Sequence, residues 1–191
     1  KERIFIMRKK FLKKISTVGL AAVAAVGLLA GCGKTDQSSK SSKTIYRTVD
    51  EIKKSGTINI GVFSDKAPFG YVDENGEYQG YDIYFAERLG KDLGVKINYV
   101  STEAANRIEY LQTGKVDVIL ANFTVTDERA EEVDFALPYM NVSLGVVSHK
   151  EHVITDLSQV GADEQVIVIS GTTAETYLTK NYPDIKLQKF D

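Results

Sequence analysis

The chain has 191 residues, of which 43% are hydrophobic and 26% are charged, and its formal net charge is −2. Residues 1–31 hold seven of its 24 basic residues but one of its 26 acidic residues, which leaves a net charge of −8 on the remainder. A chain that acidic is repelled by phosphate backbones, so nucleic-acid binding is excluded as a function. The length suits one domain, or one domain and part of a second.

The first 31 residues have the layout of an export signal. Basic residues between Met7 and Lys14 precede an uncharged run from Ile15 to Gly31 that is weakly apolar and slightly short for a membrane span. Cys32 follows directly and is the only cysteine of the chain. Neither an internal disulfide nor a thiol nucleophile is therefore expected in the folded part. We predict a signal peptide over residues 1–31.

The cysteine lies in a motif with a known modification. Leu29-Ala30-Gly31-Cys32 resembles the bacterial lipobox, in which the cysteine thiol receives a diacylglyceryl group and becomes the new N-terminus. The alternative is an incidental cysteine after a plain signal peptide. Residues 33–43 are polar and rich in serine, which is typical of a flexible tether. We predict a lipidated Cys32 and a flexible linker over residues 32–45.

The pattern of a globular α/β unit begins after residue 45. The predicted elements are, in chain order, a strand Thr57–Val62, a hairpin around Asp73–Gly76, a helix from about Asp82 to Leu93, a strand Val95–Val100, a helix spaced by Ala104, Ile108 and Leu111, and a strand Val116–Leu120. The last strand is almost continuously apolar, as in a parallel strand covered on both faces. This alternation predicts a doubly wound unit, the first lobe, over residues 46–140.

A shorter second series follows. The predicted elements are a strand Gln165–Ile169, a helix reaching about Asn181 and a strand starting at Ile185. Residues 141–148 are predicted to be an extended hinge strand between the two series, and residues 149–191 a partial second lobe. So few elements cannot bury a core of their own. Either the chain is a fragment or its second lobe is incomplete.

Arg129 is the first candidate binding residue. Thr126-Asp127-Glu128-Arg129 predicts a helix start with Thr126 as N-cap. An arginine in the first turn opposes the helix dipole. An anion shared by the guanidinium and nearby backbone N–H groups would explain its place, since the planar fork of arginine matches a carboxylate. The alternative is an ion pair with a surface acid such as Glu132.

Other polar residues lie where sheets of this type bind ligands. Asn122-Phe123-Thr124 follow a strand at its carboxyl end. Thr172-x-x-Glu175 has the form of a capping box, and the turn at Gly171 exposes backbone N–H groups that suit an anion. Lys66 and Arg107 are expected in loop-side positions, where they either serve acidic or polar ligand groups or remain solvated.

Signals of catalysis and metal binding are weak. His149 and His152 are too few for a metal site. The sequence has no Ser/His/Asp set, glycine-rich phosphate loop or zinc spacing. We expect no catalytic residue, no metal and no cofactor.

Two motifs carry a resemblance to a known family. They are Gly80-Tyr81-Asp82-Ile83, and Val116 to Glu131 with Val133-Asp134-Phe135 and Pro138-Tyr139 after it. Both resemble family 3 extracellular solute-binding proteins, the amino-acid receptors of ABC importers, and the resemblance covers the chain from about Tyr46 onward. The first motif is looser, because Tyr84 stands where the family usually has an acid.

The resemblance implies a fold. The expected class is α/β, a two-lobed periplasmic-binding-protein-like (type II) fold whose second lobe is truncated in this chain. The two lobes, joined by extended hinge strands, would close over a ligand between them. An acid that holds the ligand ammonium, and the returning hinge strand, would lie beyond Asp191.

The resemblance also implies the site residues. Arg129 would bind the ligand α-carboxylate, helped by the backbone and hydroxyls of Thr124 and Thr173. Asn122 would line the same wall, and Phe69 would lie near the cleft entrance. Lys66 and Arg107 resemble members that bind cysteine or acidic amino acids. The sequences Asp65-Lys66 and Ala104-Ala105-Asn106-Arg107 resemble cysteine-binding members most. Cysteine is therefore favoured as the ligand, and aspartate or glutamate comes next.

The function implied by the resemblance is a transport receptor without chemistry of its own. The protein would be a monomer on the extracytoplasmic face of the cell membrane, held there by its lipid anchor, and would deliver an amino acid to an ABC transporter permease. One alternative is an enzyme on the same fold, such as a dehydratase, which would need a general acid or base in the cleft. Another is a truncated surface lipoprotein that binds no ligand.

Overall fold

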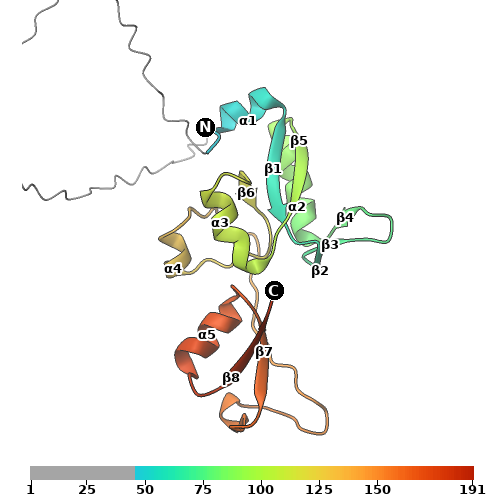
Figure 1. Cartoon of the computed structure of the whole chain (residues 1–191). Coiled ribbons are helices and arrows are strands. Elements are labelled where there is room, and N and C mark those ends of the chain that lie inside the picture. Colours follow the sequence, from blue (N-terminus) through green and yellow to red (C-terminus); the bar gives the residue numbers. More distant parts are fainter. Residues whose placement is uncertain (1–45) are drawn as a thin grey trace, which may run out of the picture. The chain divides into compact units, whose positions relative to one another are not determined.

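A computed structural model describes residues 46–191 (Figure 1). The predicted signal peptide, the lipidation site Cys32 and the linker up to residue 45 lie outside the described residues. Among residues 46–191, no helix combines the length and the apolar character of a membrane span.

The first part of the described chain is built on a parallel sheet, with the strand order β5-β1-β6 (Figure 1). Its strands are β1 (Thr57–Val62), β5 (Lys96–Ser101) and β6 (Val118–Ile119), and its helices are α1 (Val49–Ser55), α2 (Tyr81–Leu93), the 3-10 helix η1 (Ala104–Asn106), α3 (Arg107–Gln112) and α4 (Asp127–Ala130). Both strand pairs are parallel, as predicted. β6 is shorter than expected, because its ladder with β1 joins two residue pairs.

The core lies where α2 covers this sheet. Ile58, Ile60 and Val62 of β1 are almost completely buried, and Ile83 and Ala86 of α2 are buried in the same cluster. Each of the buried isoleucine and valine side chains stabilises the fold by about 1.5–3 kcal/mol through removal of its surface from water. α2 ends at Gly94, whose left-handed backbone (φ +70°) accounts for the predicted stop at this glycine.

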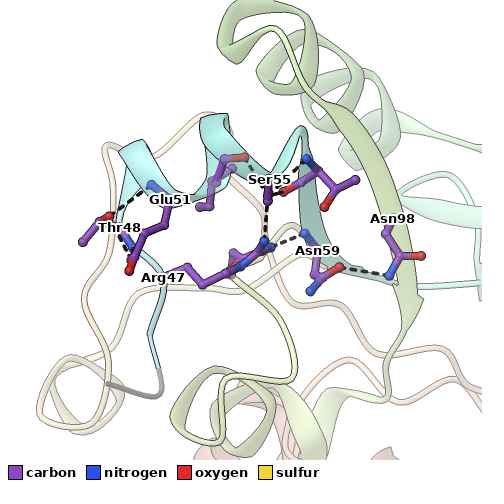
Figure 2. A network of polar contacts seen from close by, with 9 residues as sticks. Arg47, Thr48, Glu51, Ser55, Asn59 and Asn98 are labelled. Atoms are coloured by element: carbon purple, nitrogen blue, oxygen red, sulfur yellow. Dashed lines mark hydrogen bonds and ion pairs between the residues drawn. The ribbon is translucent and has the colours of Figure 1, made fainter. Parts of the chain in front are cut away.

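The beginning of the described chain is fixed to the sheet by the polar network drawn in Figure 2. Arg47 donates from Nε to Asp117 Oδ1 at 2.8 Å and from Nη1 to Ser55 Oγ at 3.0 Å, and its Nη2 also contacts Asp117. Asp117, just before β6, accepts from the backbone N–H of Asn59 in β1 at 2.7 Å. One carboxylate thus joins residue 47 to two strands of the sheet.

A small antiparallel sheet follows β1, and a two-stranded parallel sheet closes the chain. The first contains β2 (Asp65–Lys66), β3 (Gly70–Val72) and β4 (Tyr78–Gln79) in the predicted hairpin region. The second pairs β7 (Gln165–Ile169) with β8 (Lys186–Phe190), next to α5 (Thr173–Asn181) and after the 3-10 helix η2 (Leu157–Gln159). Val168 and Leu178 are the buried hydrophobic residues of this last part. The predicted strand and helix are present, with a small core.

Residues 141–148, predicted as an extended hinge strand between the two series, belong to no strand that the structure describes, and their role as a hinge stays a prediction. These residues contain neither strand nor helix. Leu144, Val146 and Val147 are 59%, 57% and 99% exposed, and no described strand pairs with this segment. The apolar alternation resembled a strand, but an extended segment becomes a strand only when another strand accepts its hydrogen bonds.

Candidate ligand-binding site

Arg129 is positioned by the start of α4. The Thr126 hydroxyl oxygen accepts from the Arg129 N–H at 3.2 Å, which confirms the predicted N-cap. The guanidinium donates from Nη1 to the Thr124 carbonyl at 2.7 Å and from Nη2 to the Gly171 carbonyl at 2.9 Å. The alternative ion pair with Glu132 is not formed, because Glu132 instead accepts from the Gln112 side chain at 2.7 Å.

The charge of Arg129 has no acidic partner within ion-pair distance among residues 46–191. The side chain is half-buried, and its guanidinium lies 4.8 Å from the centre of the Phe123 ring. Burial lowers the pKa of Arg129 below its ordinary value. Of the five N–H donors of a guanidinium, two are engaged here. A partly desolvated cation with free donors favours an anion.

Arg107 differs from its predicted loop-side position. It is the first residue of α3 and is 3% exposed. Its Nε donates to the Ala104 carbonyl at 2.9 Å, its Nη1 to those of Ala121 and Asn122 at 3.0 Å, and its Nη2 to that of Gly171 at 2.9 Å. Four of five donors are therefore engaged by backbone carbonyls. Burial and the nearby Arg129 lower the pKa of Arg107 to about 10. Its direct contact with a ligand stays a prediction.

The Gly171 carbonyl accepts from both arginines. Gly171 has a positive φ of 74°, and a Cβ there would lie 2.6 Å from the Ala105 Cα, so no side chain fits. Its N–H donates to Glu175 Oε2 at 2.7 Å, while the Thr172 hydroxyl accepts from the Glu175 N–H at 3.3 Å. The predicted capping box is thus half-formed, because Glu175 reaches the peptide before the N-cap.

Thr173 opens α5 directly after this turn. Its backbone N–H makes no hydrogen bond to another described residue. It is one of the N–H groups that a helix leaves unpaired at its first turn. The predicted contributions of Thr173 and of the Thr124 hydroxyl to ligand binding remain predictions.

Asp82 joins three segments of the site, a role that the sequence analysis missed. It is fully buried, and its Oδ2 accepts from the Asn122 N–H at 2.9 Å and its Oδ1 from the Tyr139 hydroxyl at 2.6 Å. Burial raises the pKa of Asp82, although both hydrogen bonds and Arg107 oppose the rise. The carboxylate thereby holds Asn122 in its left-handed conformation (φ +43°). An acid at the second position of an apolar-faced helix was the available signal.

The turn that carries Phe69 is attached to the same helix. The Pro68 and Phe69 carbonyls accept from the N–H groups of Tyr81 and Asp82, each at 2.9 Å. A Cβ on Gly80 would lie 2.3 Å from the Phe69 oxygen, so the close approach of the two backbones requires glycine. Phe69 is therefore connected, through Asp82, to Asn122.

Lys66, in contrast, is paired with acids. Its Nζ lies 2.5 Å from Asp65 Oδ2 and 3.9 Å from Glu103 Oε2. Hydrogen bonds thus bring Asn122, Thr124, Arg107 and Arg129 to the Gly171 turn before Thr173. Within the described part of the chain, the link from Lys66 to this group is its contact with Glu103, which precedes Ala104.

The structure has a parallel α/β sheet with polar groups at its carboxyl edge, where ligands bind in such sheets, and a second α/β unit that supplies Gly171. This is the arrangement of the periplasmic-binding-protein-like fold class. Residues 58–186 match the bacterial extracellular solute-binding proteins, family 3. The chain belongs to this family, which confirms the resemblance found in its motifs.

Three similar proteins show the range of known functions among the relatives of this chain. The solved solute receptor for L-cysteine of Neisseria gonorrhoeae is 58% identical, with a TM-score of 0.74, over 76% of this chain and 60% of that one. The ABC transporter glutamine-binding protein GlnH of Bacillus subtilis is 30% identical over 94% of this chain and 68% of its own length. Cyclohexadienyl dehydratase of Pseudomonas aeruginosa is 29% identical over 62% of this chain and 41% of its own.

The likeness to the gonococcal receptor confirms the predicted α/β, periplasmic-binding-protein-like class. The chain spans about 60% of the length of that receptor. Transport binding proteins are the nearer of these relatives, and the dehydratase matches a smaller share of the chain.

Proposed function

We propose that the protein is the extracytoplasmic receptor of an amino-acid ABC importer, and that Arg129 binds the α-carboxylate of the amino acid. The observation that carries the proposal is the half-buried guanidinium of Arg129, which has no acidic partner within ion-pair distance among residues 46–191 and keeps three donors free. Two parallel N–H donors of a guanidinium match the two oxygens of a carboxylate. Thr124, Asn122 and the N–H of Thr173 lie at the same junction and would complete the carboxylate site.

Cysteine is the proposed ligand. Support comes from the 58% identity to a receptor for L-cysteine, far above the 30% identity to a glutamine-binding protein. Phe69 would close the entrance of the site, since its turn is fastened to the helix that also positions Asn122.

We propose no catalytic step. The buried acid of the site, Asp82, has one carboxylate oxygen engaged by Tyr139 and the other by Asn122, so it is poorly placed to accept a proton from a substrate. A receptor needs no such group, because ligand contacts with both lobes are enough to favour a closed form that a permease can recognise.

The proposed location is the outer face of the cell membrane, with a monomer anchored by a lipid on Cys32. The signal-peptide layout and the lipobox resemblance support it. Cys32→Ser should release the protein from the membrane fraction into the soluble extracytoplasmic fraction. Unchanged membrane association of this variant would contradict the lipid anchor while leaving the binding proposal intact.

The binding proposal is tested by titration calorimetry of the purified full chain with L-cysteine under reducing conditions. Arg129→Gln keeps a polar side chain but removes the charge and the guanidinium fork, and we expect at least a ~100-fold loss of affinity, the value of two charge-assisted hydrogen bonds. The matched control is Arg88→Gln, at an exposed arginine that pairs with Asp92 on α2. An Arg129→Gln variant that is folded and binds as the unmodified protein does would overturn the assignment.

A further inference from the structure

Resting on this proposed function, we propose that Glu103, with Asp65 and Lys66, is a specificity determinant: it admits amino acids with neutral side chains and excludes those with acidic side chains. The three side chains form a charged corner beside the site, which we call the Glu103 corner.

The charge of Lys66 is already compensated within this corner. Its Nζ lies 2.5 Å from Asp65 Oδ2 and 3.9 Å from Glu103 Oε2. One cation and two carboxylates leave the Glu103 corner with a net negative charge. Lys66 is therefore a poor partner for a second carboxylate on the ligand, although a lysine at this position, taken alone, suggested one.

Glu103 also has an unsatisfied oxygen. The Glu103 side chain as a whole is 40% exposed, but its Oε2 is shielded from water and, apart from Lys66 Nζ at 3.9 Å, has no polar partner among the described residues. A buried acceptor without a donor is unfavourable, and more so when it is charged. A donor on the ligand, such as a thiol, a hydroxyl or an amide N–H, would relieve this cost. A carboxylate on the ligand would increase it.

The backbone places the Glu103 corner next to Arg129. Glu103 directly precedes η1, whose first residue, Ala104, accepts from Arg107 at 2.9 Å. Ala105 packs against Gly171, the residue whose carbonyl accepts from Arg129 at 2.9 Å. A ligand whose α-carboxylate lies on Arg129 thus has its other groups within a few residues of Glu103.

The remaining cation of the site cannot serve a second carboxylate. Arg107 has four of its five donors engaged by backbone carbonyls and is 3% exposed. Arg129, with three free donors, can hold one carboxylate in a fork. An acidic amino acid would bring its side-chain carboxylate close to the carboxylates of Asp65 and Glu103. Neighbouring negative charges repel each other, so such a ligand is disfavoured.

The test compares L-cysteine with L-glutamate by titration calorimetry of the full chain, in the unmodified protein and in Glu103→Gln. We expect the unmodified protein to bind cysteine at least ~10-fold more tightly than glutamate, and Glu103→Gln to narrow that ratio at least ~3-fold by tighter glutamate binding. Glu109→Gln, at an exposed acid on α3, is the matched control and should leave the ratio unchanged.

Each other outcome counts against a defined claim. Equal affinities for cysteine and glutamate in the unmodified protein would overturn the inference, while the receptor function would stand. A ratio that does not move in Glu103→Gln would remove Glu103 as the determinant. Asp65→Asn should also narrow the ratio of cysteine to glutamate affinity. If Glu103→Gln is unfolded, an unchanged ratio in Asp65→Asn would overturn the inference. Failure of every amino acid to bind would contradict the receptor function itself.

Discussion

Arg107 and Arg129 donate to the same carbonyl, that of Gly171, each at 2.9 Å, but their surroundings differ. Arg107 is almost fully buried, and its other donors meet the carbonyls of Ala104, Ala121 and Asn122. Arg129 is half-buried and makes one further hydrogen bond, to Thr124. The difference between them is the number of donors left for a ligand.

The two arginines therefore have different roles. Arg107 holds three chain segments together around the Gly171 turn, and so positions the site. Arg129 keeps the fork that can bind a carboxylate. Both guanidinium groups contact the Phe123 ring, at 4.5 Å and 4.8 Å from its centre, so proximity to this ring does not distinguish them.

The largest effect is expected on the Arg107 side. Arg107→Met keeps the apolar stem but removes four hydrogen bonds to backbone carbonyls, of which that of Gly171 retains a second donor, Arg129, and we expect it to lower the free energy of unfolding by at least ~3 kcal/mol. The urea midpoint measures the loss, with the exposed Arg88→Met as control. A variant as stable as the unmodified protein would show that the four hydrogen bonds do not hold the site together.

A smaller effect is expected at Tyr139, which reaches the site through Asp82 and Asn122. Tyr139→Phe removes the hydroxyl that donates to Asp82 at 2.6 Å but leaves the bond from Asn122 to the same carboxylate. We expect a loss of ~1 kcal/mol in the free energy of unfolding and less than a ~10-fold loss of cysteine affinity. Tyr84→Phe, at a 63% exposed tyrosine, is the control. A loss of binding as large as that of Arg129→Gln would mean that Tyr139 contacts the ligand.

The smallest effect is expected at Glu175, which accepts a hydrogen bond from the N–H of Gly171, the residue whose carbonyl both arginines share. Hydrogen bonds from Lys189 and from the Gly171 N–H lower the pKa of Glu175 below its ordinary 4.5. The ionised carboxylate therefore adds stability at neutral pH, and this stability is lost as the pH falls through the lowered pKa of the folded state.

Glu175→Gln should accordingly cost no more than ~1 kcal/mol at neutral pH, because the ion pair with Lys189 is partly solvated. Urea denaturation of both proteins at neutral pH and at acidic pH, below that lowered pKa, measures the difference, which should vanish in acid. A difference that grows in acid would show that the sign of the pKa shift is wrong.

The local elements were largely predictable from the sequence. β7 has the predicted bounds, α2 ends at the predicted glycine, and Thr126 caps α4, because alternation, glycine stops and N-caps are encoded within a few residues. The segment 141–148, predicted as a strand, is in no described strand for the opposite reason. An extended segment needs a pairing partner, and a partner is not visible in its own sequence.

The site was predictable in part. Arg129 stood out because its charge contradicts the helix dipole, and the structure leaves it with free donors. The burial of Arg107 was not predictable, since its four acceptors come from residues 104, 121, 122 and 171, which only the folded chain brings together. Asp82 was missed for the same reason, because Asn122 and Tyr139 lie about 40 and 57 residues away in the sequence.

The central claim is that Arg129 holds a ligand carboxylate, and the most direct measurement changes the ligand instead of the protein. Titration calorimetry of the unmodified full chain compares L-cysteine with L-cysteine methyl ester under reducing conditions. The account predicts that the ester, measured at a mildly acidic pH at which its amine stays protonated, binds at least ~100-fold more weakly than the acid, because it keeps the thiol but lacks the carboxylate. Equal affinity for the acid and its ester would contradict the account, because no carboxylate would then be required.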